Sequence, residues 1–523
     1  MANKVAMARW SNAKHRWLAL VGGISLLIWG LSGLTHVAMV LFGPQQAQFM
    51  PPASTLELQG ARPVAAIFAD AGITRAVAVR TVASQRGTLL QVTSDPLQPR
   101  RYFDPASGAE LPGYDRKQAE FLARHFLAER RPIAAIDLQT QFDADYPWVN
   151  RLLPVWRVRF AGDDRLTAYI HTETTSVAAV NNSTKTWLQT AFRYFHSWEW
   201  VPVSMDWLRV LVITAMVGSL AVLAVTGTMM LIAIRRKKRL PGSRGWHRAA
   251  GYVFALPLLL FSVSGIYHLI QNAITGPGNH LRMAQPLDVS GQRFAITEQW
   301  DELTAGLAVE SLSLVEGAGG RPLYRLGLAA DAPAGAGHDH GGGGEGHGGQ
   351  HAMPQTAGEI RNARFEGIQP SGPALYIDAA TGTVAPEGDR EVALLIANRF
   401  VGASAAEVTG MEMVTRFGTD YDFRNKRLPV WRVDYGAPHH ASVFVDTATG
   451  TLVDRVADWQ KPELWSFSFL HKWNFLHPLG RVTMNAIVAG FAIALVVLMA
   501  GLGLAIRSRR QQRQSSQSPT VRS

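Results

Sequence analysis

The sequence predicts a membrane α+β protein, with four transmembrane helices in a tandem duplicated arrangement and two extracytoplasmic α+β domains. Three observations predict this fold class. Apolar residues gather in four long runs of a 523-residue chain that is 47% hydrophobic and only 17% charged. Basic residues flank those runs in a pattern that fits one side of a bilayer. Several motifs then recur in the second half of the chain in the same order.

The four runs are long enough to cross a bilayer as helices, because about 20 apolar residues span about 30 Å. We place them at 17–42, 206–234, 249–271 and 483–506. Basic clusters lie in the N-terminus 1–16, in the loop 235–248 and in the tail 507–523. The positive-inside rule assigns these three segments to the cytoplasm. The expected topology is therefore several crossings with both chain ends cytoplasmic. The membrane that we expect is the bacterial inner membrane.

The two long segments between the spans, 43–205 and 272–482, are then periplasmic domains. Each has short alternating runs typical of strands and an amphipathic run typical of a helix. YPWVNRLLPVWRV at 146–158 recurs as YDFRNKRLPVWRV at 421–433, which is 275 positions later. YFDPASG around Asp104 recurs as YIDAATG around Asp378. The repeat predicts a duplication, and most of the extra length of the second copy falls in a Gly/His-rich insert at 331–356.

Histidines mark both ends of the first and third spans. His15 and His36 are 21 positions apart, and so are His247 and His268. Twenty-one residues of helix rise about 30 Å. Each residue rotates the helix by about 100°, so 21 residues bring the second imidazole to within about 60° of the first around the helix axis. Each helix therefore carries one imidazole near each membrane face, on about the same side.

Imidazole in a membrane is costly unless it has a partner or a task, and neutral imidazole is an axial ligand of haem iron. We expect His36 and His268 to hold one haem b near the outer face, and His15 and His247 to hold a second near the cytoplasmic face. The alternative for the inner pair is contact with lipid headgroups.

A further histidine pair, His196 and His471, is duplicated with the 275-residue offset and precedes the second and fourth spans. These two residues are alternative ligands at the outer level.

The insert carries a looser group of donors. His338, His340, His347 and His351 lie among glycines that cannot form a packed core. Such a segment binds Cu, Ni or Zn loosely, or is a linker with incidental metal affinity.

The opening HRW of the first span, the LPVWRV strand, the YFD and YID hairpins and the duplicated histidine before the second and fourth spans resemble the PepSY-associated transmembrane family. The resemblance implies PepSY-like outer domains. It also implies kinship with inner-membrane haem-containing ferric-siderophore reductases or with iron-regulated membrane proteins.

The leading functional hypothesis is a haem-b electron-transfer protein that reduces a ferric siderophore or another metal chelate outside the cytoplasm. The chain has no nucleotide-binding fingerprint and no cysteine, so a membrane quinol or a separate cytoplasmic reductase would supply the electron. The net charge is +11, but the basic residues cluster beside the spans, where membrane topology explains them, so we do not expect nucleic acid as a partner. The alternatives are a non-enzymatic membrane protein for metal handling or partner binding, and a metal or siderophore transporter.

Overall fold

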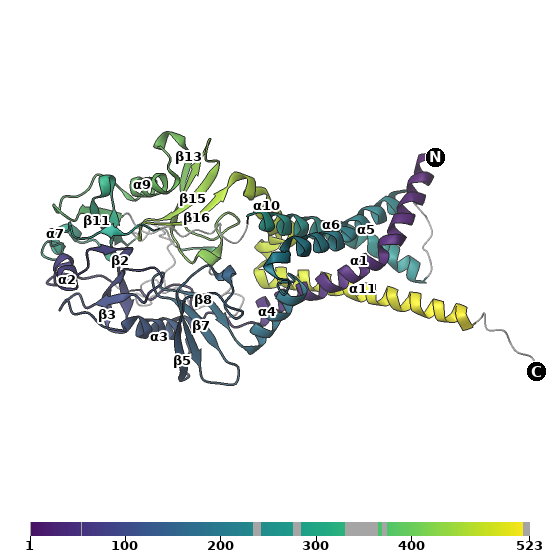
Figure 1. Ribbon diagram of the computed structural model, residues 1–523, viewed down its shortest axis with the longest axis horizontal. Helices are drawn as coiled ribbons and strands as arrows, with labels where there is room; N and C mark the ends of the chain where they lie inside the picture. Colours follow the sequence, from purple (N-terminus) through teal and green to yellow (C-terminus); the bar gives the residue numbers. More distant parts are fainter. Residues whose placement is uncertain are drawn as a thin grey trace, which may run out of the picture. The chain divides into compact units, whose positions relative to one another are not determined.

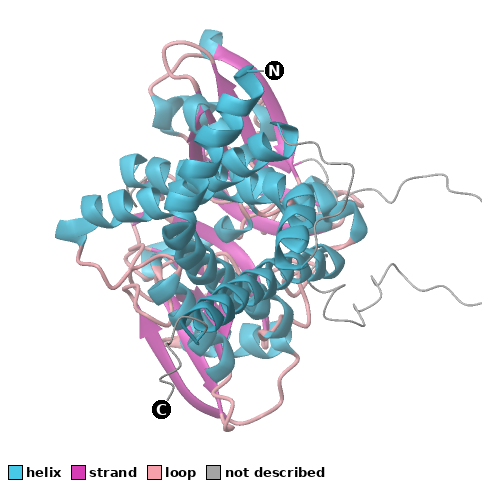
Figure 2. Cartoon of the chain, turned by 90° about the vertical axis from the view of Figure 1, so that its right-hand side faces the viewer, coloured by secondary structure: helices cyan, strands magenta, loops and turns pink. Residues whose placement is uncertain are grey.

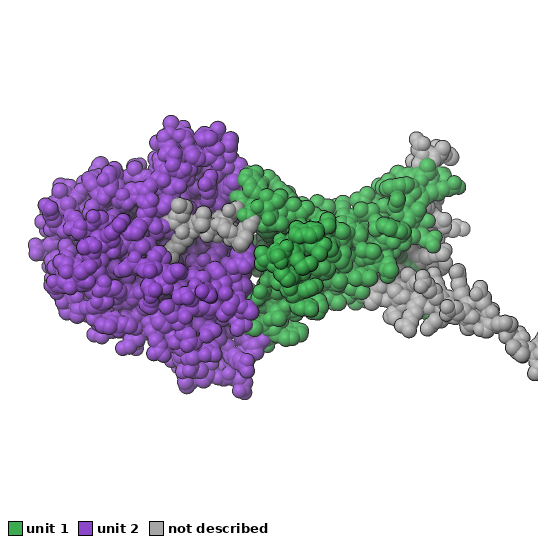
Figure 3. All heavy atoms as spheres, viewed as in Figure 1, with its two compact units in different colours: residues 1–43, 184–276, 459–523 green, residues 44–183, 277–458 purple. Residues whose placement is uncertain are grey.

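The computed structural model describes residues 2–53, 55–233, 242–275, 284–329, 365–368 and 374–515. The chain divides into two compact units, each built from both halves of the sequence (Figures 1 and 3). A helical unit comprises 1–43, 184–276 and 459–523, and a sheet unit comprises 44–183 and 277–458.

Four long helices dominate the helical unit: α1 (Ala2–Phe42), α5 (Asp206–Ala233), α6 (Gly242–Thr275) and α11 (Arg481–Ser515). Each contains a stretch long and apolar enough to cross a membrane. The four helices predicted from the sequence are therefore confirmed. Three of them extend well past the predicted spans, because polar and basic residues of good helical propensity continue the helix beyond its apolar part.

The helices of this unit pack side by side (Figure 2). α5 lies between α1 and α6, and α11 packs mainly on α1. Small residues allow the close approach: a Cβ on Gly22 of α1 would lie 2.2 Å from Leu223 of α5. The shorter helices α4 (Ser183–Phe195) and α10 (Lys461–Ser466) precede α5 and α11, and a π-helical turn, Phe467–His471, continues α10.

The sheet unit is organised around one antiparallel sheet of six strands. Its order is β12-β11-β10-β2-β3-β4, with bounds β2 (Ala78–Ser84), β3 (Gly87–Thr93), β4 (Arg101–Phe103), β10 (Val309–Glu316), β11 (Pro322–Leu328) and β12 (Ala374–Asp378). Each half of the chain contributes three strands. The two triplets join where Arg80 and Val79 of β2 pair with Ser313 and Leu314 of β10.

The sequence predicts two separate outer domains, at 43–205 and 272–482, whereas the six-stranded sheet takes strands from both of these segments. Residues 44–183 of the first segment and 277–458 of the second lie in one compact unit, while 184–205 and 459–482 belong to the helical unit. The physical reason is that β2 and β10 would otherwise each expose unpaired backbone at a sheet edge, and pairing them removes both edges. Nothing in a single sequence marks a pairing between segments so far apart.

Two four-stranded antiparallel sheets follow chain order and match each other strand for strand. Equivalent strands begin 274 or 275 positions apart. Their bounds are β5 (Ile133–Gln139), β6 (Val155–Phe160), β7 (Thr167–His171) and β8 (Ser176–Asn181), against β13 (Val408–Val414), β14 (Val430–Tyr435), β15 (Ala441–Asp446) and β16 (Thr451–Ala457). The helices α3 (Tyr114–Leu127) and α9 (Asp389–Val401) pack on these sheets at the same offset. The remaining elements are α2 (Val64–Asp70), α7 (Trp300–Thr304), β1 (Arg75–Ala76) and β9 (Leu287–Asp288).

A buried carboxylate holds the helix and sheet together in each half. Asp115 of α3 accepts hydrogen bonds from Trp156 Nε1 at 2.7 Å and from the Tyr102 hydroxyl at 2.8 Å. Asp389 of α9 accepts the same bonds from Trp431 and Tyr376, at 2.6 and 2.7 Å. The tryptophans of the LPVWRV motifs are therefore structural.

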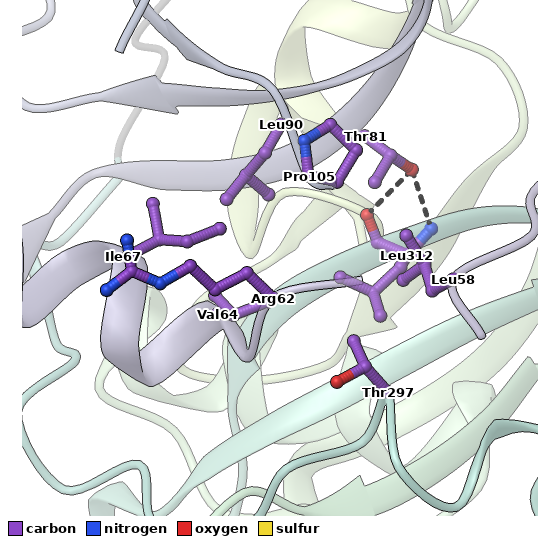
Figure 4. A pocket seen from close by; sticks show the side chains of 9 residues that line it. All are labelled: Leu58, Arg62, Val64, Ile67, Thr81, Leu90, Pro105, Thr297 and Leu312. Atoms are coloured by element: carbon purple, nitrogen blue, oxygen red, sulfur yellow. Dashed lines mark hydrogen bonds between the residues drawn. The ribbon is translucent and has the colours of Figure 1, made fainter. Parts of the chain in front are cut away.

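Charged side chains also connect the two halves inside the sheet unit. Arg427 donates to Glu173 at 2.8 Å and to Asp446 at 2.5 Å, and all three side chains are largely buried. Arg100 lies 3.4 Å from the same Glu173 carboxylate. Figure 4 shows a small, mostly apolar cavity near the β2–β10 junction, where the Thr81 hydroxyl bonds to both backbone groups of Leu312.

Candidate functional site

The outer histidines predicted from the sequence belong to one cluster in the helical unit. His36 lies near the end of α1 and His268 in α6, while His196 follows α4 and His471 ends the π-helical turn. Burial, with the neighbouring His36 and His268, lowers the pKa of His196 to about 3. Burial, with the neighbouring His196 and His268, lowers the pKa of His471 to about 3 as well. His196 and His471 are therefore neutral imidazoles at physiological pH.

Serine hydroxyls of the membrane helices orient His196 and His471. Ser32 Oγ lies 3.0 Å from His196 Nδ1, and Ser264 Oγ lies 3.3 Å from His471 Nδ1. Each serine already donates its proton to a carbonyl of its own helix, at 2.6 Å in both cases. The serine oxygens therefore accept from Nδ1–H, which leaves Nε2 as the unprotonated nitrogen of each ring.

The Nε2 atoms of His196 and His471 make no hydrogen bond to any residue that the structure describes. A metal-ligating histidine is typically a neutral imidazole whose Nδ1–H donates a hydrogen bond while its unprotonated Nε2 is available to the metal. These two residues, which the sequence ranks second at the outer level, thus have the contacts expected of ligands.

Glycines leave space beside the same two rings. A Cβ on Gly265 would lie 3.2 Å from His471 Cε1, and one on Gly33 would lie 3.9 Å from His196 Cε1. The Ser-Gly pairs that precede His36 and His268 by four and three positions therefore serve His196 and His471.

A phenylalanine contacts two histidines in each half of the cluster. Phe192 lies 4.5 Å from His196 and 5.4 Å from His36, measured between ring centroids. Phe467 lies 4.9 Å from His471 and 3.6 Å from His268. Phe192 and Phe467 are related by the 275-residue offset, as are His196 and His471, and the phenylalanine rings give the cluster an apolar lining.

His268 and His36, the outer ligands first expected, have different surroundings. His268 bonds through Nδ1 to Glu463 at 2.5 Å and through Nε2 to Asn272 at 2.9 Å. His36 has no hydrogen bond within the described part of the chain, and its side chain is exposed. His196 and His471, by contrast, each have a serine hydroxyl bonded to Nδ1.

The inner pair is also brought together. The rings of His15 and His247 lie 5.9 Å apart, between centroids. His15 Nδ1 lies 3.2 Å from Thr226 Oγ1, whose proton goes to the carbonyl of Val222 at 2.7 Å. His15 is therefore anchored by α5 in the same way as the serine-bound histidines, and Gly227 leaves room beside its ring.

A comparison with protein families matches residues 13–341 to the PepSY-associated TM region, which is more than half of the chain. The chain belongs to this family. A comparison with curated proteins found no match. The family resemblance read from the sequence is thus confirmed, and the fold agrees with it in having four candidate membrane helices joined to α+β regions.

The insert of this PepSY-associated protein carries the other metal contacts predicted from the sequence. His338, His340, His347 and His351 lie outside the described residues. Within the described residues, no group of three or more His, Asp or Glu side chains is placed to hold a metal ion. The half-buried arginines of the LPVWRV strands are ion-paired, Arg157 with Asp137 and Arg432 with Asp434.

Sequence reasoning missed Thr226, Glu463 and the two phenylalanines. Phe192 and Phe467 are four positions before the duplicated histidines, so the repeat itself was a usable signal. Thr226 and Glu463 have no equivalent in the other half, and only the packing of the helices reveals them.

Proposed function

We propose that this membrane protein of the PepSY-associated family is a haem-b electron-transfer protein that reduces a ferric chelate outside the cytoplasm. The observation that carries the proposal is the state of the histidines: His15, His196 and His471 each have Nδ1 anchored by a hydroxyl, which leaves Nε2 unprotonated. Uncommitted imidazole nitrogens in a largely apolar setting fit the axial positions of haem iron.

The donor set suggests one haem at each level of the membrane. His196 and His471 hold the outer haem, while His36 and His268 belong to its surroundings. His15 and His247 hold the inner one. Haem b, when bound, supplies an iron that takes up and gives off one electron at a time. The residues around it hold the rings in place and exclude water.

The reaction that fits is the one-electron reduction of Fe(III) to Fe(II) in a chelate. Reduction weakens the hold of hard oxygen ligands, because Fe(II) is the weaker Lewis acid. One membrane quinol, which loses two electrons and two protons in becoming quinone, supplies the electrons for two ferric chelates. The alternative electron source is a separate cytoplasmic reductase. A ferric siderophore is the substrate class we favour, with the sheet unit as its docking partner.

The topology follows from the same proposal. The protein lies in a bacterial inner membrane with both ends cytoplasmic, so that the sheet unit is periplasmic. That unit consists of two PepSY-like halves that arose by tandem duplication, as the matched strand bounds suggest. The Gly/His-rich insert at 331–356 binds Cu, Ni or Zn weakly and takes no part in electron transfer.

The experiment that tests the proposal follows electron transfer from the reduced haem to a ferric chelate. Purified protein is reduced with dithionite under anaerobic conditions, freed of excess reductant and mixed with a ferric hydroxamate chelate in a stopped-flow spectrometer. We expect the reduced haem bands to decay while Fe(II) appears, and we expect His471→Ala to abolish the fast phase. His439→Ala, which removes a histidine of the sheet unit paired with Glu407 at 2.9 Å, is the control. Bands that stay reduced in the presence of the chelate would refute chelate reduction.

A further inference from the structure

Glu463 is a buried acid beside the outer histidine cluster. The helical unit contains three acidic residues in all, namely Glu199, Asp206 and Glu463. The first two pair with arginines and are about 40% exposed. The Glu463 side chain is only 4% exposed, and its partner is the imidazole of His268, at 2.5 Å.

The hydrogen bonds define the charge of this pair. The side-chain amide nitrogen of Asn272 lies 2.9 Å from His268 Nε2, and an amide NH2 group can only donate. Nε2 is therefore unprotonated, and Nδ1 carries the proton that Glu463 Oε1 accepts. His268 is thus neutral, and the pair bears the single negative charge of a buried carboxylate.

A continuous set of contacts connects this charge to a proposed haem ligand. Glu463 bonds to His268, and the Phe467 ring stacks on His268 at 3.6 Å. The Phe467 ring also contacts His471, at 4.9 Å between centroids, and the ammonium group of Lys472 lies 4.5 Å from its centroid. In the first half, Leu188 occupies the position 275 residues before Glu463, so that half has no corresponding charge.

We propose that Glu463 tunes the outer redox site, by placing a buried negative charge that favours the oxidised form of the iron. Such a site gives up its electron more readily than a neutral surrounding would allow. It therefore suits ferric chelates with hard oxygen ligands, which bind Fe(III) tightly and are difficult to reduce. Glu463 touches neither iron nor substrate, so it is a positioning residue.

This inference rests on the proposed function, and it is tested by potentiometric titration of the full-length protein at one fixed pH. Glu463→Gln keeps the shape of the side chain and removes its charge. A unit charge near the iron, at the effective dielectric of a protein interior, changes the equilibrium constant by about tenfold. We expect reduction of one haem to become about tenfold more favourable, a shift of about 59 mV for one electron.

Glu199→Gln is the matched control, because it removes an arginine-paired surface carboxylate of the same unit. We expect it to leave both titration waves in place. Two haems with unchanged potentials in Glu463→Gln would overturn the inference and leave the proposed function intact. A shift of both waves alike would also overturn it, since the effect would not be local. A wild-type protein without haem would instead refute the proposed function, and this is seen before any variant is made.

If Glu463→Gln loses the outer haem, Glu463→Asp decides the question because it retains the carboxylate. A retained haem whose reduction equilibrium lies within about threefold of wild type would support the charge as the cause. A lost haem, or an equilibrium raised about tenfold in this variant too, would overturn it.

Discussion

Ser32 and Ser264 offer a comparison in which the structure predicts unequal results from equivalent changes. Ser32→Ala removes the hydroxyl that accepts from His196 Nδ1, and Ser264→Ala removes the one that accepts from His471 Nδ1. Both serines are buried. The difference is a second acceptor, because the carbonyl of Phe261 lies 3.3 Å from His471 Nδ1.

The expected magnitudes follow from that difference. In Ser32→Ala, the Nδ1–H of His196 loses the acceptor that the structure provides, at a cost of about 1–3 kcal/mol. Loss of a residue that hydrogen-bonds to a metal ligand weakens metal binding by about 10–100-fold. In Ser264→Ala, the Phe261 carbonyl still accepts, so we expect a loss of about tenfold or less in haem affinity.

Haem transfer to an excess of a scavenging haem-binding protein, followed at the Soret band, measures both losses. Ser25→Ala is the control, since Ser25 is a buried serine of α1 whose hydroxyl, among the residues that the structure describes, bonds only to the carbonyl of Val21, at 2.9 Å. We expect haem loss to be fastest in Ser32→Ala, intermediate in Ser264→Ala and unchanged in Ser25→Ala. If Ser32→Ala retains haem as well as Ser25→Ala does, the serine has no part in orienting a ligand.

Four further changes test other parts of the structure. His15→Ala should reduce the haem content from two to one per chain in a haemochrome assay. Gly265→Ala should weaken haem binding more than Gly33→Ala, because its Cβ would meet the neighbouring histidine at 3.2 Å against 3.9 Å. Glu173→Gln should lower the thermal unfolding midpoint, since breaking a buried ion pair costs about 3–5 kcal/mol. Asp389→Asn should make the free energy of unfolding fall less steeply between pH 7 and pH 3 than it does in the wild type.

The sign of the last effect follows from the charges around Asp389. Burial alone would raise the pKa of this carboxyl, but Arg325 and the hydrogen bonds from Trp431 and Tyr376 more than offset burial and lower the pKa. A group whose pKa is lower in the folded state stabilises the fold above its unfolded pKa of about 4 and loses that contribution as the pH falls. If the unfolding free energy of Asp389→Asn falls between pH 7 and pH 3 as steeply as that of the wild type, other carboxyl groups determine the acid dependence.

The remaining three predictions can each fail in a distinct way. Two haems retained in His15→Ala would exclude that residue as a ligand. Equal haem binding in Gly265→Ala and Gly33→Ala would mean that the ring of His471 moves freely. An unfolding midpoint in Glu173→Gln equal to that of the wild type would show that the ion pair contributes little.

Hydropathy and the positions of charged residues were enough to predict the four helices, because both are local properties of the sequence. The strands of the LPVWRV motifs and the helices α3 and α9 were predictable for the same reason. The β2–β10 pairing was not, since it joins segments more than 200 residues apart through two residue pairs. A repeat shows that two halves are alike, and it does not show how they associate.

The histidines illustrate the same limit at the site. The 21-residue spacing predicted His15 and His247 as a pair, and their rings lie 5.9 Å apart between centroids, one on α1 and the other on α6. Their role as haem ligands stays a prediction. The spacing also favoured His36 and His268 at the outer level, because a spacing along one helix contains no information about side chains arriving from another segment. His196 and His471 approach Ser32 and Ser264 from the chain outside these helices. Their orientation therefore required the tertiary structure.

The most direct test of the account is an absorption spectrum of the detergent-purified protein, oxidised and then reduced with dithionite, combined with a pyridine haemochrome assay. The account predicts a Soret band, sharp reduced α bands and about two haems b per chain, one at each histidine level. A protein that stays colourless after expression with ample haem would contradict it, and would leave the histidines of both levels as structural members of a membrane protein that binds a partner.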